Sequence, residues 1–551
     1  MFSIANGGSP SAALEQAHAT LGRYFGYESF RPGQERVISS ILARRDVLAV
    51  MPTGAGKSIC YQVPALMGSG LTLVVSPLIS LMEDQTRALL AAGAHPSYLN
   101  SSLSIPQQNT VLKRAADGAY QLMFVAPERL ADPRFIAFAQ AAAQPGGMGI
   151  PLLAVDEAHC VSQWGQDFRP AYLQIAQFIE ALPQRPVVAA FTATATERVR
   201  MDIQQMLCLH APQVVVTGFD RPNLSFEVQE MPERQKASWI CRYVTEHPDE
   251  AGIVYCATRK SVDELTLTLQ DAVEKQGLDM RVASYHAGMG MESRTQNQQA
   301  FVRDDVRVMV ATNAFGMGID KPNVRFVIHY NMPKDLESYY QEAGRAGRDG
   351  QPARCTLLYS GTDVRTIRFF IEKELEADNG LPADVKAEAA RKAEERLKYM
   401  TFYSTTPKCL RGFLLQYFGE AVPAKCGNCS CCLAEEREAQ LQLEYSRRRA
   451  ADNARRLAEK PRRSKSTAAA GELSEFDEKL LNALYAQRKR LAGKQNVPAF
   501  VVFSDATLRE MAVKKPMSID ELLNISGVGE KKAARYGNAF LRIIEDAVES
   551  R

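Results

Sequence analysis

The chain is 551 residues long, with 46% hydrophobic residues, 23% charged residues and a formal net charge of +3. These proportions are typical of globular proteins and exclude wholesale disorder, and the length predicts about three or four domains. The near balance of charge excludes a histone-like polycation but permits local basic grooves. No apolar run of about 18 residues or more is present, and the start MFSIANGGSP lacks secretory features. We therefore expect a soluble, cytoplasmic protein without a membrane segment.

Short apolar runs alternate with longer helical stretches up to about residue 360. Such runs predict the buried strands of parallel sheets, because helices cover both faces of these sheets. The first set falls at 46–51, 71–76, 120–126, 152–157 and 186–194. The second set falls at 251–257, 280–286, 306–312 and 324–330. Two successive arrays predict an α/β fold with two lobes that meet near 217–223.

Beyond residue 360 the pattern becomes helical. The run DVKAEAARKAEERLKYM predicts a surface helix over 384–400, which leads into a cluster of cysteines. Residues 434–470 are rich in Ala, Glu and Arg and predict a helix that fades into a linker. A compact, helix-patterned segment runs from 472 to the end. We therefore expect smaller helical units after the two lobes.

The segment MPTGAGKS at 51–58 directly follows the first apolar run. Gly54 and Gly56 allow the backbone to wrap a phosphate, Lys57 can reach the β- and γ-phosphate oxygens of ATP, and Ser58 offers a hydroxyl to Mg²⁺. The first glycine of the usual G-x-x-x-x-G-K-[ST] pattern is replaced by Met51. A glycine-rich turn before an ordinary helix is therefore the alternative on this element alone.

The sequence DEAH at 156–159 ends a second apolar run about 100 residues later, where the acidic partner of a phosphate loop is expected. Asp156 would hold Mg²⁺ through water, and Glu157 would orient and deprotonate the attacking water. Phosphoryl transfer also needs positive charge at the transition state. QEAGRAGRDG offers Arg345 and Arg348 from the second lobe, and we expect both to reach across the cleft. Taken singly, each arginine is more often a solvated surface residue.

Five of the eleven cysteines crowd into 24 positions, and the others are scattered singly as small hydrophobic residues. Without an export signal, such a cluster favours a metal site over disulfides. Cys409, Cys426, Cys429 and Cys432 are spaced C-x16-C-x2-C-x2-C, which suits a closed tetrahedral Zn²⁺ site. An iron–sulfur cluster is the alternative. Cys431 is left outside the predicted ligand set.

These motifs, together with FTATAT at 191–196, resemble superfamily 2 helicases, and the chain more narrowly resembles the RecQ DNA helicases. The specific marks are FGYESFRPGQE, SPLISLMEDQ, CVSQWGQDFRPAY, FGMGIDKPNVRFVIH and the cysteine cluster. The last 80 or so residues resemble the HRDC domain. The resemblance covers about 15–433 and 472–551. It implies two RecA-like lobes with parallel sheets around ATP, a small helical zinc-binding module and an all-α HRDC domain.

On this resemblance the chain divides into six segments. These are a flexible N-terminus (1–14), the ATP-binding lobe 1 (15–217), lobe 2 (218–360), the zinc-binding module (361–433), a basic linker (434–471) and the HRDC domain (472–551).

The resemblance also implies further nucleotide-binding residues. Arg31 and Gln34 would recognise adenine, which explains a preference for ATP. Thr53 would belong to the phosphate loop, and Asp320 would approach the ribose or the nucleotide face of the second lobe.

Other residues are implied in DNA binding and in coupling. Thr192 and Thr194 of FTATAT would couple the two lobes. The segment 160–172 resembles the aromatic-rich loop of the family, in which Trp164, Phe168 and Arg169 would sense single-stranded DNA. Aromatic and guanidinium planes stack on unpaired bases, which supports this role. The alternative is that the two aromatic residues belong to the core.

The segment 433–471 is too short for the winged-helix domain that RecQ helicases usually carry there. Its nine Lys and Arg residues between 447 and 465 predict either a phosphate-binding segment or a solvated charged helix. In the HRDC domain, Gly527-Val528-Gly529 and the following Lys531 and Lys532 resemble a hairpin that holds a phosphate. The alternative to DNA binding by this domain is contact with another protein or a purely packing role.

The resemblance therefore implies an ATP- and Mg²⁺-dependent DNA helicase that moves 3′ to 5′ on single strands in recombination and repair. The alternatives are a single-strand translocase or remodeller with weak unwinding, and a DNA-binding or annealing protein in which ATP regulates affinity. We expect single-stranded, tailed or branched DNA as substrate, and single-strand-binding or recombination proteins as partners. The expected state is a monomer at the bacterial nucleoid.

Overall fold

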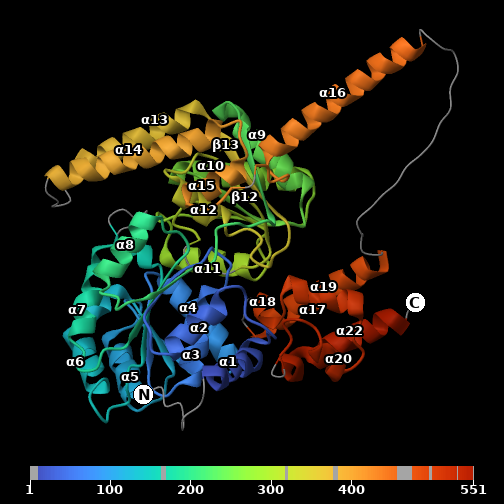
Figure 1. Cartoon of the computed structure of the whole chain (residues 1–551). Helices are drawn as coiled ribbons and strands as arrows, with labels where there is room; N and C mark the ends of the chain where they lie inside the picture. The colour runs from blue at the N-terminus through green and yellow to red at the C-terminus, as the bar shows by residue number, and fades with distance from the viewer. Residues whose placement is uncertain are drawn as a thin grey trace.

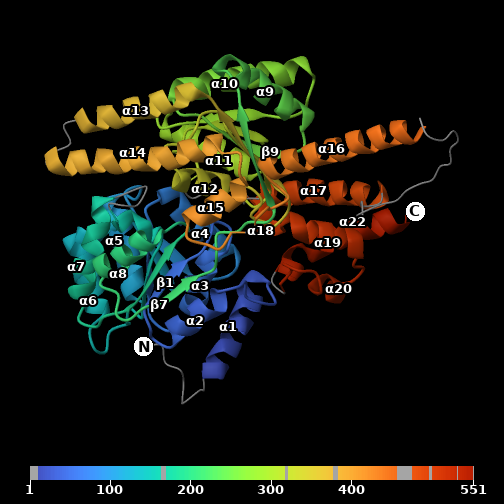
Figure 2. The same cartoon turned by 45° about the horizontal axis from the view of Figure 1, so that its top comes forward.

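A computed structural model describes residues 10–162, 169–316, 321–376, 383–422, 424–455, 475–495, 499–529 and 532–549. Two α/β lobes lie against each other, with the zinc-binding module beside the second lobe and the HRDC domain beside both (Figures 1 and 2). None of the helices in these ranges is long and apolar enough to cross a lipid bilayer.

The first lobe is built on a seven-stranded parallel sheet with the order β3-β4-β2-β5-β6-β1-β7. The strands are β1 (Val47–Val50), β2 (Thr72–Val75), β3 (Pro96–Leu99), β4 (Leu122–Val125), β5 (Leu152–Val155), β6 (Val187–Thr192) and β7 (Gln213–Val216). Along β1, Leu48 and Val50 enter one core while Val47 and Ala49 enter another. This alternation follows from the two-residue period of a strand covered on both faces.

Helices surround this sheet, and the first of them starts at Pro10, within the segment assigned to the N-terminus. The helices are α1 (Pro10–Phe25), α2 (Gln34–Leu42), α3 (Lys57–Met67), α4 (Ile79–Ala91), α5 (Ile105–Ala116), η1 (Pro127–Ala131), α6 (Pro133–Ala142), η2 (Ala158–Val161), η3 (Pro170–Leu173), α7 (Gln174–Glu180) and α8 (Glu197–Met206).

The second lobe holds a six-stranded parallel sheet with the order β10-β11-β9-β12-β13-β8. The strands are β8 (Leu224–Glu230), β9 (Ala251–Tyr255), β10 (Val282–Tyr285), β11 (Val308–Ala311), β12 (Val324–His329) and β13 (Ala353–Tyr359). The helices are α9 (Glu233–Glu246), α10 (Arg259–Lys275), α11 (Met291–Val302) and α12 (Leu336–Ala343).

Each apolar run of the sequence coincides with a strand, so the prediction of two parallel-sheet lobes is confirmed. Four strands were missed: β3, β7, β8 and β13. Three of them, β3, β7 and β8, lie at sheet edges. Edge strands bury fewer side chains, so their sequences are less continuously apolar. In β13, Arg354 and Thr356 interrupt the apolar pattern.

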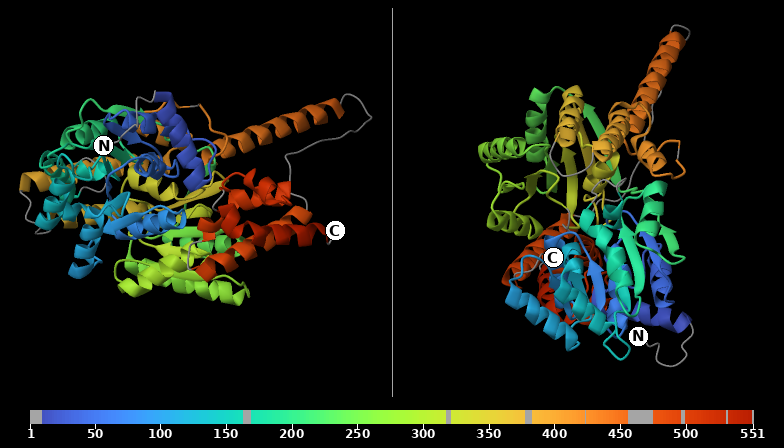
Figure 3. Two further views of the ribbon diagram at one scale, coloured as in Figure 1. Left: turned by 90° about the horizontal axis from the view of Figure 1, so that it is seen from below. Right: turned by 90° about the vertical axis from the view of Figure 1, so that its left-hand side faces the viewer.

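The zinc-binding module and the start of the linker are helical. The helices are α13 (Gly361–Glu376), α14 (Ala383–Thr405), α15 (Leu410–Tyr417) and α16 (Ser430–Arg455). The helix predicted over 384–400 is part of α14, which forms a hairpin with α13 (Figure 1). Helix α16 extends away from the body of the lobes (Figures 1 and 3).

The C-terminal segment, expected to be an HRDC domain, is all-α and has a hydrophobic core of its own. Its helices are α17 (Glu475–Gln495), α18 (Ala499–Val502), α19 (Asp505–Lys514), α20 (Ile519–Leu523), the π-helical turn η4 (Ala533–Gly537) and α22 (Asn538–Glu549).

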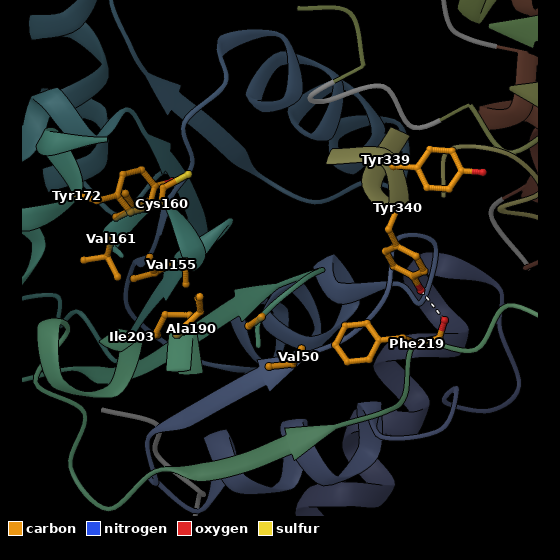
Figure 4. Packing of buried hydrophobic residues seen from close by; sticks show 14 of the residues in the cluster. Val50, Val155, Cys160, Val161, Tyr172, Ala190, Ile203, Phe219, Tyr339 and Tyr340 are labelled. Carbon is orange, nitrogen blue, oxygen red and sulfur yellow. Dashed lines mark hydrogen bonds between the residues drawn. The ribbon is translucent and has the colours of Figure 1, made fainter. Parts of the chain in front are cut away.

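The segment between β7 and β8 joins the two lobes. Its Phe219 packs edge-on to Tyr340 of α12, with ring centroids 6.0 Å apart, and stacks on Phe418 at 4.4 Å. The Tyr340 hydroxyl donates to the carbonyl oxygen of Phe219 at 2.6 Å (Figure 4). The same hydrophobic core contains residues of both lobes and of the zinc-binding module. The joining segment is therefore fixed to the second lobe.

Candidate nucleotide-binding and zinc sites

The phosphate-loop segment follows β1 and ends at the N-terminus of α3. Gly54 and Gly56 have φ angles of 85° and 78°, in the left-handed region that favours glycine. A Cβ at Gly56 would lie only 2.6 Å from Nε2 of Gln34. Lys57 is the first residue of α3, and its Nζ donates to the carbonyl oxygen of Met51 at 3.1 Å. A glycine turn that opens into a helix N-terminus is an arrangement that binds phosphate.

Arg31 and Gln34 contact the outside of the same loop. The Arg31 guanidinium donates to the carbonyl oxygen of Gly54. The Gln34 amide donates to the carbonyl oxygens of Ala55 (3.1 Å) and Gly56 (2.9 Å). The backbone N–H of Arg31 donates to Oε1 of Gln34 at 2.8 Å. The two residues expected to recognise adenine therefore lie beside the phosphate loop.

The acidic pair Asp156 and Glu157 directly follows β5. The pKa of Asp156 is raised to about 7, mainly by burial and also by the charge of Glu157, while Lys57 opposes the shift. Burial also lowers the pKa of Lys57, and the two carboxylates oppose this shift. Ser58 follows Lys57 in the first turn of α3. Carboxylate and hydroxyl oxygens suit Mg²⁺, and a buried carboxylate gains from a cation, so these residues fit a magnesium–nucleotide complex.

A hydrogen-bonded connection leads from the acidic segment to the second lobe. The Nδ1 atom of His159 lies 2.9 Å from Oγ1 of Thr192. The Thr192 hydroxyl donates to the carbonyl oxygen of Thr194 at 3.0 Å. From the second lobe, Nε2 of Gln341 donates to Oγ1 of Thr194 at 3.4 Å. The two threonines expected to couple the lobes therefore lie on a direct contact between them.

The two arginines of QEAGRAGR have different surroundings. Arg345 is buried, and its guanidinium donates to the carbonyl oxygen of Gly316 inside the second lobe. Arg348 lies against the phosphate loop, with its Cγ 3.3 Å from the position of a Cβ on Gly54. Burial lowers the pKa of Lys57, and the charge of Arg348 adds to that effect. The structure thus brings Arg348 to the phosphate loop and bonds Arg345 within its own lobe.

The four predicted zinc ligands come together. The Sγ atoms of Cys409, Cys426, Cys429 and Cys432 all lie within 4.8 Å of one another. Cys429 and Cys409 are 3.9 Å apart, and Cys426 and Cys432 are 4.0 Å apart. Zn–S bonds of about 2.3 Å in a tetrahedron place sulfurs at about this separation. The Sγ atom of Cys431 faces the carbonyl oxygen of Thr406 at 3.6 Å instead.

Backbone N–H groups support this sulfur cluster. The N–H of Gly412 lies 3.3 Å from Sγ of Cys409, and the N–H of Asn428 lies 3.4 Å from Sγ of Cys426. Such bonds stabilise thiolates, which are the metal-binding form. The donor set of four sulfurs fits a closed, structural Zn²⁺ site.

Four family models match successive parts of the chain. They are the DEAD/DEAH box helicase (31–203), the helicase conserved C-terminal domain (235–350), the RecQ zinc-binding domain (361–433) and the HRDC domain (477–544). The ATP-dependent DNA helicase RecQ of Bacillus subtilis (strain 168) is 40% identical over 607 aligned residues, which cover 97% of this chain and 99% of that protein. The chain belongs to the RecQ family of DNA helicases.

A second relative agrees with this membership, and a solved structure agrees with the fold. The ATP-dependent DNA helicase RecQ of Pasteurella multocida (strain Pm70) is 35% identical over 97% of this RecQ-family chain and 93% of that protein. Among solved structures, the DEAD-box helicase Mss116 bound to ssRNA and UDP-BeF matches with a TM-score of 0.53 and 16% identity. That match covers 73% of this chain and 89% of the other, and it concerns the fold alone.

In this RecQ-family chain the zinc-binding module is anchored to the second lobe. The Ser225 hydroxyl on β8 donates to the carbonyl oxygen of Asn428 at 2.8 Å, and the N–H of Val228 lies 3.4 Å from Oγ of Ser430. Nη2 of Arg411 donates to the carbonyl oxygen of Leu224 at 2.6 Å. The predicted zinc ligands therefore lie in a segment that bonds directly to the edge strand β8.

The HRDC domain of this RecQ-family chain contacts both lobes (Figure 3). Nη1 of Arg488 lies 2.6 Å from Asp505 of its own domain, and Nη2 lies 3.8 Å from Asp304 of the second lobe. On the first lobe, a Cβ at Gly26 would lie 2.7 Å from the backbone nitrogen of Gly529. The glycine turn expected to hold a phosphate is thus packed against lobe 1, and Lys531 falls outside the described residues.

The aromatic-rich segment is described only at its ends. Trp164 and Phe168 lie outside the described residues, as does Asp320 of the nucleotide prediction. Nη1 of Arg169 donates to the carbonyl oxygen of Pro77 at 3.1 Å, just before α4. This bond connects the loop to the SPLISLMEDQ segment of the same lobe.

One residue at the nucleotide site was missed from the sequence. Arg221, in the segment that joins the lobes, donates from Nη1 to the carbonyl oxygen of Thr53 at 2.5 Å. Its only sequence signal is a basic residue within the predicted seam at 217–223. Its hydrogen-bond partners are backbone carbonyls, which every residue type has, so the sequence gives no indication of these contacts.

Proposed function

We propose that this chain hydrolyses ATP and uses the movement of its two lobes to translocate 3′ to 5′ on single-stranded DNA and to unwind duplexes. One observation carries the proposal. Lys57 and the acidic pair of the first lobe converge with Arg348 of the second lobe at a single seam. Hydrolysis at such a seam changes the contacts between lobes, and this coupling is what a translocating motor requires.

In the proposed reaction, Lys57 binds the β- and γ-phosphate oxygens at the N-terminus of α3. Ser58 and Asp156 would hold Mg²⁺, Asp156 through water. When bound, this ion would neutralise part of the negative charge on the phosphates. Glu157 orients the attacking water and accepts its proton on a carboxylate oxygen, while Arg348 stabilises the charge of the transferring phosphoryl group.

On the DNA side, Trp164, Phe168 and Arg169 sense an unpaired strand by stacking. Thr192 and Thr194 pass this contact to the ATP site, a role supported by the bond from Gln341 to Thr194. The bacterial relatives named DNA helicases support DNA as the substrate. The proposed process is recombination and repair, which the family resemblance of the motifs implies. We propose that the chain acts as a monomer at the nucleoid, with single-strand-binding or recombination proteins as partners.

A second candidate is an ATP-driven single-strand translocase, remodeller or annealing protein with weak unwinding. The observation that favours it is α16, a single extended helix (Ser430–Arg455) that follows the zinc ligands. The chain reaches the HRDC match at 477 soon afterwards, which leaves little length for a strand-separating domain.

Strand displacement separates the two candidates. Duplexes with a 3′ or a 5′ single-stranded tail are incubated with ATP and Mg²⁺, beside a Lys57→Ala variant. Displacement from the 3′-tailed duplex alone, absent in the variant, is the result expected of a helicase. If single strands stimulate ATP turnover while neither duplex is displaced, the translocase is correct. Absence of DNA-stimulated turnover would overturn the helicase and the translocase and leave the annealing protein.

A further inference from the structure

The segment that joins the lobes carries a partly buried arginine for which the reaction above has no role. Arg221 stands between the end of β7 and the start of β8. Two residues earlier, Phe219 is bonded to Tyr340 of α12 (Figure 4). The backbone N–H of Phe219 also donates to a carboxylate oxygen of Glu420 at 2.5 Å, and Nη2 of Arg411 donates to the carbonyl oxygen of Pro222 at 3.1 Å. Contacts on both sides therefore fix the backbone that presents Arg221.

The guanidinium of Arg221 contacts both lobes. Nη1 donates to the carbonyl oxygen of Thr53 in the phosphate loop at 2.5 Å and to that of Gly344 at 3.3 Å. Nη2 donates to the carbonyl oxygens of Ala346 (3.0 Å) and Gly347 (2.8 Å). Three of these four acceptors belong to the turn that carries Arg345 and Arg348. The planar fork of arginine can make such bonds together, which the single ammonium of lysine cannot.

Two glycines allow this close approach of the lobes. A Cβ at Gly344 would lie 3.2 Å from Cβ of Thr53. A Cβ at Gly54 would lie 3.3 Å from both Nη1 of Arg221 and Cγ of Arg348. Arg221 and Arg348 therefore lie side by side on the phosphate loop, where larger side chains would separate the lobes.

The charge of Arg221 is compensated by carbonyl dipoles. Burial lowers its pKa, and among the charged groups around it Arg348 and Arg31 lower it further. Its hydrogen-bond acceptors are the four carbonyl oxygens and Oδ1 of Asn223, which lies 3.3 Å from Nε. Burying a cation is costly, and an ordinary structural ion pair would offset that cost with a carboxylate. A guanidinium bound by carbonyls of two lobes suits a contact that forms and breaks as the lobes move.

We propose that Arg221 is a positioning residue that fastens the turn 344–347, and with it Arg348, to the phosphate loop. The lobes then cannot close without also bringing Arg348 to the phosphate loop. Asn223 fixes the fork, because its Nδ2 donates to the carbonyl oxygens of Gly347 (2.9 Å) and Gln351 (2.8 Å). The inference rests on the proposed ATP hydrolysis and adds a residue that controls when it occurs.

The test compares Arg221→Gln and Arg221→Lys with the wild-type chain. We expect Arg221→Gln to lower kcat for DNA-stimulated ATP hydrolysis by about 100-fold, because small misplacements of catalytic groups have effects of that size. KM for ATP should change less than threefold. Arg221→Lys should fail to restore the rate, although it keeps the charge. Circular dichroism establishes that each variant is folded.

The matched control is Arg185→Gln. Arg185 is also a multidentate arginine, but its partners Asp46, Pro186 and Cys208 all lie in lobe 1. Its loss should leave kcat unchanged. In a double-variant cycle, Arg221→Gln combined with Arg348→Ala should be no slower than Arg348→Ala alone, because one residue acts through the other.

A measurement in the absence of nucleotide tests the contact of Arg221 with the phosphate loop. Small-angle X-ray scattering of the nucleotide-free chain should give a larger radius of gyration for Arg221→Gln than for the wild type or Arg185→Gln. Unchanged scattering, a kcat within threefold of wild type, or independent effects of Arg221 and Arg348 would each overturn the inference. A wild-type chain that hydrolyses no ATP would instead refute the proposed function, whatever the scattering shows.

Discussion

A buried ion pair joins the zinc-binding module to the second lobe. Nζ of Lys236 on α9 is fully buried and lies 3.0 Å from Oδ2 of Asp363, in the first turn of α13. Asp363 also accepts hydrogen bonds from the N–H of Ser360 (2.9 Å) and from Nδ2 of Asn331 (3.0 Å). Glu233 is a second, half-exposed partner of Lys236 at 3.0 Å. Removing either member of the pair should therefore weaken the attachment of the module.

The expected magnitude follows from the separation and the burial. Two unit charges 3.0 Å apart attract each other by about 5 kcal/mol at an effective dielectric constant of about 20. Removing one partner leaves a buried charge, which costs about 3–5 kcal/mol. We expect Lys236→Met to cost about 4 kcal/mol of unfolding free energy. Asp363→Asn should cost about 3 kcal/mol, because Glu233 still partners Lys236.

Urea denaturation followed by circular dichroism measures these changes. The double variant Lys236→Met/Asp363→Asn should be more stable than the sum of the single effects predicts, because it buries no unpaired charge. The control is Lys275→Met, which breaks an exposed pair with Asp271 and should leave the unfolding free energy unchanged. Single losses below about 1 kcal/mol that add in the double variant would refute the reasoning.

Three further predictions concern single residues. Glu157→Gln should lower DNA-stimulated ATP turnover by at least about 100-fold while a fluorescent ATP analogue still binds; equal loss of binding would contradict the assignment. Burial beside Asp335 raises the pKa of Glu337 to about 7, so the folded chain holds an extra proton and its stability falls as pH rises from about 4.5 to 7. Glu337→Gln should flatten that profile in thermal melts and raise Tm at pH 8; an unchanged profile would show that Glu337 does not cause it. Gly26→Ala, at a φ of 73° and against Gly529, should speed proteolytic release of the HRDC domain. Gly277→Ala, at a φ of 64° with open space around it, should not.

The motifs that the sequence predicts depend on short runs of residues and on their position directly after apolar strands. Lys57 and Ser58 follow β1, and Asp156 follows β5, so parallel strands bring them to one edge of a sheet. Cys426, Cys429 and Cys432 are spaced for a metal whether or not the fold is known. Functional sites can therefore be predicted from the sequence where short-range spacing, or the common edge of a parallel sheet, brings their side chains together.

Contacts between distant backbone segments could not be predicted in this way. Arg221 bonds a carbonyl 168 residues earlier and others more than 120 residues later, and any residue type can supply a carbonyl. The contact of Gly26 with Gly529 depends on how the HRDC domain packs, which no local pattern records. Likewise, the conformation of the turn directs Arg348 to the phosphate loop and Arg345 into its own lobe. The spacing of the two arginines in the sequence does not predict this difference.

The position of the zinc-binding module also bears on aggregation. Strand β8 lies at an edge of the second sheet, and uncovered strand edges pair readily with other chains. Ser225 and Val228 of this strand form hydrogen bonds with Asn428 and Ser430, which lie beside the predicted zinc ligands Cys426 and Cys429. Loss of the metal, or a chain cut after residue 360, would leave this edge open. Such preparations should precipitate by edge-to-edge pairing even where each lobe is correctly folded.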